Sequence, residues 1–333
     1  MNKETLQKWA NFIWYQDNFI GLCLLPFSMI FNDIVRFRRY LYRIGLLKKH
    51  KLSVPIIIVG NITVGGTGKT PLTIYIIEQL KQLGYRPGVI ARGYCGESEQ
   101  WPQMVGKDSN PEVVGDEPLV IARHSECPIA VGPDRVAAAK LLLQQTDCNV
   151  IISDDGLQHY RLERDIEIIV VDGERRFGNG YSLPSGPLRE AVSRIREVDF
   201  LVCNGGNAEE DEFPMVVQGN KAINLLSGEQ QSLDYFKNKK CHAVAGIGNP
   251  QRFFSLLDDA DISCRQHVFA DHHDFAREDL SFEDSSEILM TEKDSVKCAA
   301  FVQKNYWHIP VTASLPEVFT EKLVNRLEEK LHG

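Results

Sequence analysis

The stretch VGGTGKT at 64–70 constrains the fold more than any other part of the chain. An apolar run at 54–60 precedes it and predicts a buried strand, and apolar residues at helical spacing follow it. In a strand–loop–helix unit, glycines let backbone N–H groups face phosphate oxygens, and the helix adds its positive dipole end. The pattern predicts that a nucleoside triphosphate binds at Thr63, Val64, Gly65, Gly66, Thr67, Gly68, Lys69 and Thr70. Lys69 is expected to reach the β- and γ-phosphates, and the Thr70 hydroxyl to bind Mg²⁺.

The loop departs from the strict motif at one position, because Thr63 stands where a glycine is usual. Two classes of nucleotide-binding protein are excluded by what the loop and its surroundings lack. Partitioning ATPases carry an extra lysine before the glycines, where this chain has Val64. GTPases read guanine with [NT]KxD, and TEKD at 291–294 has its lysine one place late. We therefore expect ATP as the co-substrate.

Carboxylates follow the next buried strands. The apolar run at 149–153 ends at Asp154 and Asp155, which are expected to hold Mg²⁺ at the carboxyl end of a strand. Another apolar run, at 166–171, ends at Asp172. Strands alternating with helices predict an α/β fold, in which a parallel sheet of the P-loop NTPase type has helices on both faces.

The N-terminal 51 residues differ in charge from the rest. They carry a net charge of about +6 within a chain whose total is −8, so the remainder carries about −14.

The eight cysteines are scattered without a CxxC pair, which argues against a zinc site or a disulfide framework and favours a reducing cytosol.

Aromatic and aliphatic residues at 9–31 precede a basic, aromatic-rich stretch at 36–51. The continuous apolar part, 19–31, contains Pro26 and is shorter than the roughly 20 residues that span a bilayer. This composition favours helices that lie on an anionic membrane surface. A helical hairpin packed on the core is the alternative. Nucleic-acid binding is disfavoured, because the remainder is acidic and has no known reading motif.

Three further clusters carry chemically useful side chains. GDEP at 115–118 opens a predicted helix, where acidic residues also favour the first turn for structural reasons. LPSGPLRE at 183–190 presents Arg189, which suits a phosphate clamp or a plain surface turn. ADHHDF at 270–275 fits a catalytic histidine or a polar turn better than a two-histidine metal site, because adjacent side chains point apart.

Taken together, these motifs resemble the tetraacyldisaccharide 4′-kinase family, the lipid A 4′-kinases of Gram-negative bacteria. The resemblance runs over nearly the whole chain, and the order of its motifs is specific. They are VGNITVGGTGKTP at 59–71, ARGY at 91–94, GDEP at 115–118, GPDR at 132–135, DDGLQH at 154–159, LPSGPLRE at 183–190, AGIGNP at 245–250, DHHDF at 271–275 and TEKD at 291–294.

The resemblance implies a transferase of lipopolysaccharide biosynthesis. It implies transfer of the ATP γ-phosphate to the 4′-hydroxyl of a tetraacylated glucosamine disaccharide 1-phosphate, which gives lipid IV-A. It also implies a monotopic enzyme on the cytoplasmic face of the inner membrane. We expect the lipid and an anionic membrane surface as partners, with no nucleic acid and no obligate protein partner. The alternative from another class is a membrane-associated P-loop switch ATPase without a lipid substrate.

The resemblance also implies roles for individual residues. Asp116 is implied to accept the proton of the sugar hydroxyl, and His272 rather than His273 is implied to orient the Asp116 carboxylate. Lys69 and Arg189 are implied to stabilise negative charge on the transferring phosphate. Substrate contacts are implied for Tyr94, Arg135, Gln158, His159 and Glu190, and metal contacts for Thr70 with Asp154 or Asp155.

The expected architecture has three parts. They are a membrane-associating helical segment at 1–51, a P-loop kinase domain at 52–224 and a smaller α/β domain at 225–333, whose last helix is compatible with packing on either domain. With the nucleotide on one domain and His272 on the other, we expect the domains to close on binding.

Overall fold

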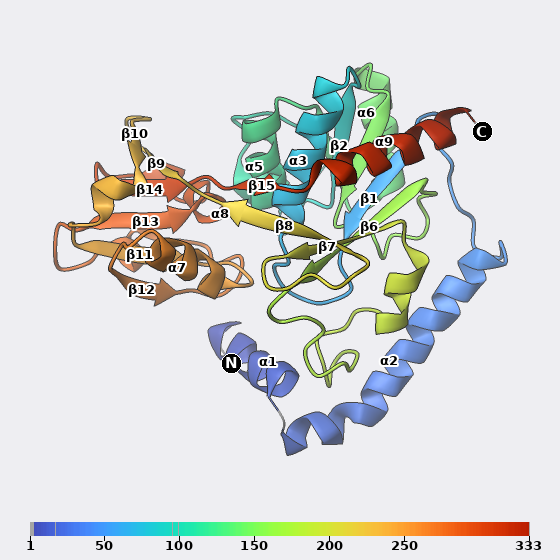
Figure 1. The fold of residues 1–333 in the computed structure, drawn as a ribbon, viewed down its shortest axis with the longest axis horizontal. Helices are drawn as coiled ribbons and strands as arrows, with labels where there is room; N and C mark the ends of the chain where they lie inside the picture. Colours follow the sequence, from blue (N-terminus) through green and yellow to red (C-terminus); the bar gives the residue numbers. More distant parts are fainter. Residues whose placement is uncertain (1–2, 17, 95, 99, 333) are drawn as a thin grey trace.

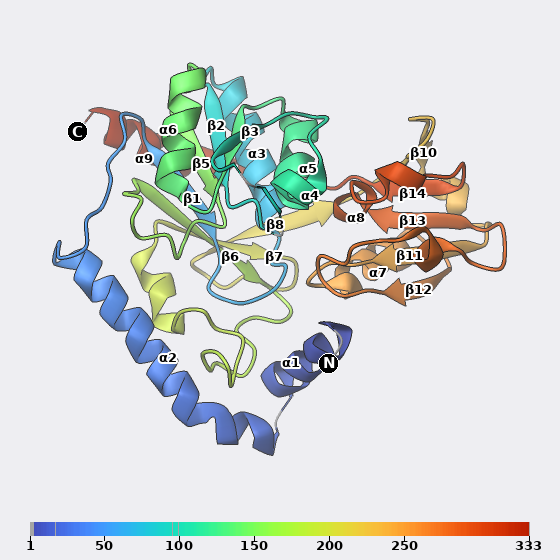
Figure 2. The ribbon, with the colours of Figure 1, turned by 180° about the vertical axis from the view of Figure 1, so that it is seen from behind.

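The computed structural model describes residues 3–16, 18–94, 96–98 and 100–332. In these residues the strands form two sheets, and the smaller sheet lies beside one end of the larger one (Figure 1). Two N-terminal helices lie at the periphery in both views (Figures 1 and 2). Cys95 lies outside the described residues, and the other seven cysteines carry free thiols.

The larger sheet has the strand order β15-β8-β7-β6-β1-β5-β2-β4-β3. Neighbouring strands from β8 to β4 pair in parallel, and antiparallel pairs occur at the two edges. Its strands are β1 (Ile56–Gly60), β2 (Pro87–Ala91), β3 (Gln103–Val105), β4 (Ile129–Val131), β5 (Val150–Asp154), β6 (Ile166–Asp172), β7 (Phe200–Asn204), β8 (Glu212–Gln218) and β15 (Thr312–Ser314).

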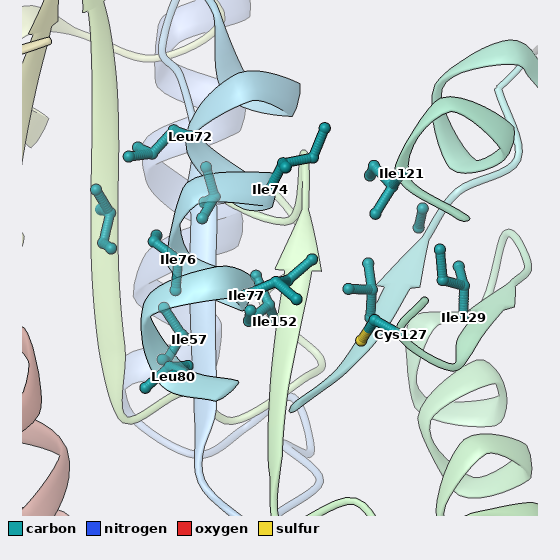
Figure 3. Packing of buried hydrophobic residues seen from close by; sticks show 14 of the residues in the cluster. Ile57, Leu72, Ile74, Ile76, Ile77, Leu80, Ile121, Cys127, Ile129 and Ile152 are labelled. Carbon is teal, nitrogen blue, oxygen red and sulfur yellow. The ribbon is translucent and has the colours of Figure 1, made fainter. Parts of the chain in front are cut away.

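Helices cover both faces of this sheet. Strand β1 is buried along its whole length, and its alternate residues enter two different cores, with Ile57 on one face and Ile58 on the other. Figure 3 shows the first core, where α3 packs its leucine and isoleucine side chains against β1 and β5. That face is covered by helices α3 (Lys69–Gln82), α5 (Asp116–Ser125) and α9 (Glu317–His332). The other face is covered by α6 (Arg135–Gln145). The predicted α/β fold is confirmed.

The smaller sheet has the order β10-β9-β14-β13-β11-β12. Its four strands from β14 to β12 are parallel, and β9 and β10 join them antiparallel. The elements are β9 (Lys221–Asn224), β10 (Gln230–Ser232), β11 (Cys241–Ala245), α7 (Pro250–Asp259), β12 (Cys264–Val268), β13 (Glu287–Thr291), α8 (Glu292–Ser295) and β14 (Tyr306–Ile309). Short segments connect the elements of the two sheets: α4 (Pro111–Val114), η1 (Val192–Glu197), η2 (Leu233–Phe236), η3 (Arg277–Leu280) and η4 (Ala299–Phe301).

The chain does not stay in the smaller sheet to its end. That sheet begins at Lys221, shortly before the boundary expected at 224, and the chain returns to the larger sheet with β15. Helix α9 packs on the larger sheet, where Phe319, Leu323 and Leu327 join the core formed around α3. The smaller sheet is therefore inserted between β8 and β15.

The N-terminal helices are α1 (Lys3–Tyr15) and α2 (Phe19–Arg43). Helix α2 continues through Pro26, which removes one backbone hydrogen bond without ending the helix. The expectation that this segment is too short to span a bilayer is therefore wrong. By length and composition, the 25-residue helix could cross a membrane. By itself one such helix is weak evidence for membrane association.

Helix α2 nevertheless contacts the larger sheet's loops along much of its length. The Ser28 hydroxyl donates to the Ser182 carbonyl at 2.7 Å and accepts from the Ser185 N–H at 2.9 Å. The Ser185 hydroxyl donates to the Gly21 carbonyl at 2.7 Å, and Arg39 pairs with Glu197. A helix held this way lies along the protein surface.

Candidate functional site

The glycine loop between β1 and α3 has the geometry of a phosphate cradle. Gly68 precedes α3 with a φ of 96°, and a Cβ there would lie 2.1 Å from the amide nitrogen of Asn204. That amide donates to the Thr67 carbonyl at 2.9 Å, so the end of β7 holds the loop from the side. The Thr67 hydroxyl is buried and has no partner among the described protein atoms, as expected of a group that faces a ligand.

The departure at Thr63 has a structural reason. Thr63 forms an antiparallel bridge with Leu188, and the neighbouring Val64 N–H donates to the Pro187 carbonyl at 2.8 Å. Its backbone is thus paired like a strand and does not need a glycine's positive φ. The same pairing brings the loop at 183–190 alongside the phosphate cradle.

Two carboxylates lie at the end of β5 beside this cradle. Asp154 is buried and accepts from the Thr73 hydroxyl at 3.1 Å, while Asp155 lies 3.6 Å from the Lys69 ammonium and 3.2 Å from Arg189. Burial, together with the nearby Glu117, raises the pKa of Asp154 to about 7. Burial would also raise the pKa of Asp155, but Lys69 and Arg189 outweigh it and hold that pKa well below its usual range.

These donors fit a magnesium ion. Mg²⁺ is usually held by one or two carboxylates, a hydroxyl, substrate phosphates and water rather than by a closed protein cage. In the described part of the chain, no group of three or more histidine, cysteine or acidic residues forms such a cage. Asp154 at the end of β5 and the adjacent Asp155 are donors of this kind, and Thr70 lies in the first turn of α3.

Most of the other predicted substrate residues surround this strand end. Arg135 is 3% exposed, and its guanidinium donates to the carbonyls of Gly132, Asp154 and Asp155. Burial, with the positive charge of Arg135, lowers the pKa of His159 to about 4. Glu190 is buried and accepts from Gln158 at 2.8 Å.

Asp116 lies at the start of α5 and faces the smaller sheet. Its Oδ2 is 3.0 Å from Nδ1 of His272, and its Oδ1 accepts from the Glu117 N–H at 2.8 Å. Burial would raise the pKa of Asp116, but Lys293, the His272 hydrogen bond and Lys297 outweigh it and hold the pKa well below its usual range. The carboxylate is therefore ionised at neutral pH.

The structure distinguishes between the adjacent histidines. His272 has a φ of 56°, and its ring lies 4.9 Å from that of Tyr94 as well as against Asp116. His273 instead contacts Asp279 at 2.9 Å and packs beside Phe275. Only His272 of this pair reaches the larger sheet's carboxylate.

The smaller sheet also touches the phosphate cradle itself. A Cβ on Gly248 would lie 2.4 Å from the backbone nitrogen of Gly66, so this close approach requires glycine. Arg252 of α7 forms an ion pair with Asp172 at 2.8 Å and donates to the Asn204 carbonyl at 2.6 Å. The two sheets thus meet directly at the loop where nucleotide phosphates are expected.

Sequence reasoning missed four residues at this junction. Asn204 ends β7 as Asp154 ends β5, so the strand-end rule could have found it. Lys293 lies in the TEKD stretch, which was compared with a guanine-reading motif and counted among the motifs of the resemblance, but no role was assigned to its lysine. Arg252 and Lys297 had no sequence signal, because their contacts come from distant segments.

Comparison with known proteins places this geometry in a family. The family model for tetraacyldisaccharide-1-P 4′-kinase matches residues 20–328. A tetraacyldisaccharide 4′-kinase of Nitrosococcus oceani is 49% identical over 316 residues, covering 95% of this chain and 93% of the relative. One from Methylobacillus flagellatus is 46% identical over 327 residues, covering 97% of each. The crystal structure of "apo" form LpxK from Aquifex aeolicus in complex with ATP has a TM-score of 0.77 and 29% identity, covering 92% of this chain and 99% of that one.

Proposed function

Because the chain belongs to the tetraacyldisaccharide 4′-kinase family, it is an ATP-dependent kinase of lipid A biosynthesis, and we propose that Asp116 receives the proton of the acceptor hydroxyl. The reaction transfers the γ-phosphate of ATP to the 4′-hydroxyl of a tetraacylated disaccharide 1-phosphate and gives lipid IV-A. The observation that carries the proposal is the 3.0 Å contact between Asp116 and His272, which joins the two sheets beside the phosphate cradle. The switch ATPase without a lipid substrate is not favoured.

The nucleotide would occupy the loop at 63–70, with its phosphates on the backbone N–H groups and the Lys69 ammonium. Asp154, Asp155 and Thr70 would hold Mg²⁺, which supplies neutralisation of phosphate charge when bound. Lys69 and Arg189 already flank Asp155 at 3.6 and 3.2 Å, so both cations lie where the transferring phosphate would gather negative charge.

Asp116 meets the requirements of a proton acceptor in phosphoryl transfer. It is ionised at neutral pH, and His272 and the Glu117 N–H fix the orientation of its two oxygens. Kinases commonly position an aspartate in this way to accept the proton of a substrate hydroxyl. His272 would orient the carboxylate from the smaller sheet.

The acceptor headgroup is expected on the side where α1 meets the loop that carries His272. The Asp271 N–H donates to the Gln7 side chain at 3.1 Å, so α1, which lies below the two sheets in Figure 1, contacts the loop that carries His272. Beside this contact lies a hollow of about 720 Å³ that Lys8 and Arg175 line together with Phe12 and Tyr15. We expect a phosphorylated sugar to enter here. Substrate contacts by Tyr94, Arg135, Gln158, His159 and Glu190 stay predictions.

The same side is suited to a membrane surface, and we place the enzyme as a monotopic protein on the cytoplasmic face of the inner membrane. Three apolar side chains of α2, those of Phe27, Met29 and Ile30, are about 60% exposed or more. Replacing all three with serine should lower partitioning onto anionic vesicles more than tenfold, because each apolar side chain contributes about 1.5–3 kcal/mol when buried. Vesicle sedimentation measures this, and unchanged partitioning would remove α2 as the anchor.

Incubation of the full-length enzyme with γ-labelled ATP, Mg²⁺ and the tetraacyl disaccharide 1-phosphate tests the function. Label should appear in a lipid product and should depend on both substrates. Label in inorganic phosphate alone, with no label in lipid, would contradict the lipid kinase and support the switch ATPase.

A further inference from the structure

Helix α5 contacts the smaller sheet's short helix α8 at both of its ends. In its first turn, Glu117 pairs with Lys293 of α8 at 3.1 Å. In its last turn, Nε2 of His124 lies 2.6 Å from the carboxylate of Glu292, the first residue of α8. Between residues 117 and 124, a helical rise of about 1.5 Å per residue separates the two contacts by about 10 Å. The contact through His124 therefore lies outside the proposed site.

This second contact is shielded from water. The side chain of His124 is 20% exposed and that of Glu292 is 13% exposed. A charge-assisted hydrogen bond is roughly twice as strong as a neutral one, and salt screens a partly buried pair less than an exposed one. The pair between His124 and Glu292 therefore stabilises the contact of the two sheets more than an ordinary surface ion pair would.

The strength of this contact depends on a proton. The hydrogen bond from His124 to Glu292 raises the pKa of His124, and the Glu292 charge adds to this effect, although burial opposes it. Because the folded-state pKa lies above the ordinary value near 6.5, the full ion pair is present below about pH 6.5. The ion pair is lost as the pH rises through the raised pKa. A neutral imidazole then faces the carboxylate and holds it less strongly.

The other charged groups near the pair leave this titration to His124. Glu78 of α3 also raises the pKa of His124, and Lys221 of β9 lowers it, each with a smaller effect than Glu292. His308 of β14 lies within electrostatic range of the pair, and its Nδ1 is buried without a hydrogen-bond partner among the described protein atoms. Burial lowers the pKa of His308, so its ring stays neutral where His124 changes charge.

Two short linkers join the smaller sheet to the larger one. Residues 219–220 lead from β8 to β9, and residues 310–311 lead from β14 to β15. Because β8 and β15 are antiparallel neighbours, the two linkers lie side by side and can act as a hinge. Beyond these linkers, the sheets are held together by noncovalent contacts, so a change in one contact alters how firmly they stay closed.

We propose that His124 and Glu292 form a proton-dependent latch between the two sheets. With His124 charged, the latch holds α8 against α5 and keeps the smaller sheet closed on the phosphate cradle. With His124 neutral, the latch weakens and the sheets separate more easily about their linkers. Closure of the enzyme therefore decreases as the pH rises, whichever groups carry out the phosphoryl transfer.

Two substitutions separate the charge of the pair from its packing. Glu292→Gln keeps the size of the side chain and an oxygen acceptor but removes the negative charge. His124→Arg keeps a positive charge at every pH tested, because arginine is not deprotonated in proteins. Lys107→Gln is the matched control, because it removes an exposed ion pair with Glu126 at the other side of the same helix end, within the larger sheet's part of the chain.

A ¹⁵N-histidine NMR titration of the full-length enzyme tests the protonation step, and H124R identifies the His124 signal by its disappearance. In the wild type and in K107Q, the pKa of His124 should lie above 6.5. In E292Q that pKa should fall, because burial is then opposed mainly by Glu78. A wild-type pKa at or below 6.5, or an unchanged pKa in E292Q, would overturn the proposal.

Hydrogen exchange of backbone amides in α5 and α8 tests the opening step. Rates divided by the intrinsic rate at each pH report how often these elements open. In the wild type and in K107Q, protection at pH 6.5 should exceed protection at pH 8.5 by about three- to tenfold, as expected for a weakened charge-assisted hydrogen bond. E292Q should show the lower protection at both pH values, and H124R the higher. Wild-type protection that is equal at the two pH values, or a difference between E292Q and the wild type that is constant with pH, would show a merely structural pair.

Both measurements require neither ATP nor lipid, so a failure of the proposed lipid phosphorylation would leave them intact. Labelled lipid formed by the active enzyme provides a third readout. The ratio of kcat/KM in H124R to that in the wild type should rise about three- to tenfold between pH 6.5 and 8.5, because only the wild type loses its latch. A ratio that does not change with pH would show that this contact does not control closure.

Discussion

The larger sheet supplies its site residues from the ends of neighbouring parallel strands, whereas the smaller sheet supplies His272 and Lys293 from a loop and a short helix. Asp154 and Asn204 end β5 and β7, and the phosphate cradle follows β1. These positions are fixed by strand pairing on both sides. His272 and Lys293 reach Asp116 only because the smaller sheet is held against the larger one.

This difference separates two kinds of control. In the proposed site the larger sheet carries Asp116 and the groups expected to bind nucleotide phosphates, while the smaller sheet is expected to orient them. Substitutions in the larger sheet's site should therefore lower kcat strongly, because they remove reacting groups. Substitutions in the smaller sheet should lower kcat less, because they disturb only the orientation of those groups.

The largest expected effect on kcat comes from comparing Asp116 of the larger sheet's site with His272 of the smaller sheet. Asp116→Ala should lower kcat roughly 10²–10⁴-fold, because a general base is lost. His272→Gln should cost roughly 10–100-fold, because it removes only orientation. Single-turnover transfer of labelled phosphate measures both, and calorimetry with a non-hydrolysable ATP analogue should show unchanged binding. Equal losses from the two substitutions would contradict the division.

A contact confined to the larger sheet and α2 should affect stability instead. Ser185→Ala leaves the Gly21 carbonyl without its buried donor and should lower the free energy of unfolding by about 1–3 kcal/mol. Chemical denaturation measures the change, and Ser193→Ala, at an exposed position, is the matched control. Equal stability of the two variants would show that α2 is not fixed through Ser185.

A contact that crosses between the sheets should affect nucleotide binding. Arg252→Ala removes the ion pair with Asp172 and the donor to the Asn204 carbonyl, and the Asn204 side chain in turn donates to the Thr67 carbonyl of the phosphate cradle. The Kd for a non-hydrolysable ATP analogue should rise about tenfold, since a hydrogen bond to a charged group contributes about 1.5 kcal/mol or more. Arg265→Ala, on the exposed edge strand β12, should bind normally. Identical Kd values for the two variants would show that the Arg252 contacts of the smaller sheet do not affect nucleotide binding at the cradle.

The smallest effect concerns pH and lies wholly within the larger sheet. The folded-state pKa of His159 is about 4, below the value near 6.5 of an unfolded histidine. The unfolded state therefore binds more protons between these values, and stability falls as pH decreases from about 6.5 to 4. His159→Gln should reduce that fall in Tm relative to the wild type. A Tm difference that is constant with pH would contradict the burial of a neutral His159.

The sequence predicted best what local pattern determines. The run at 54–60, the glycines after it and the helix that follows are neighbours in the chain, so periodicity and motif spacing located β1, the cradle and α3. Asp154 was found because a buried strand ends there. Resemblance to the family added Asp116 and His272, which no spacing connects across 156 residues.

What escaped prediction depends on contacts between distant segments. The residue pattern alone did not separate His272 from His273, because adjacent identical side chains carry no signal for the left-handed backbone at His272, and only the resemblance to the family favoured His272. The return of α9 to the larger sheet depends on a core that Phe319 shares with α3 residues. The extent of α2 was underestimated, because polar and basic residues after Phe31 continue the helix after the apolar run has ended.

The insertion of the smaller sheet between β8 and β15 has a consequence for engineering. Thr312 lies opposite Gln218 in an antiparallel pair, so the inserted segment leaves and re-enters at adjacent points. A two-residue turn, which suits antiparallel neighbours, could replace residues 219–311 and convert β8 and β15 into a simple hairpin. The result would be a minimal nucleotide-binding module without His272, and the excised part could be exchanged between relatives as a cassette.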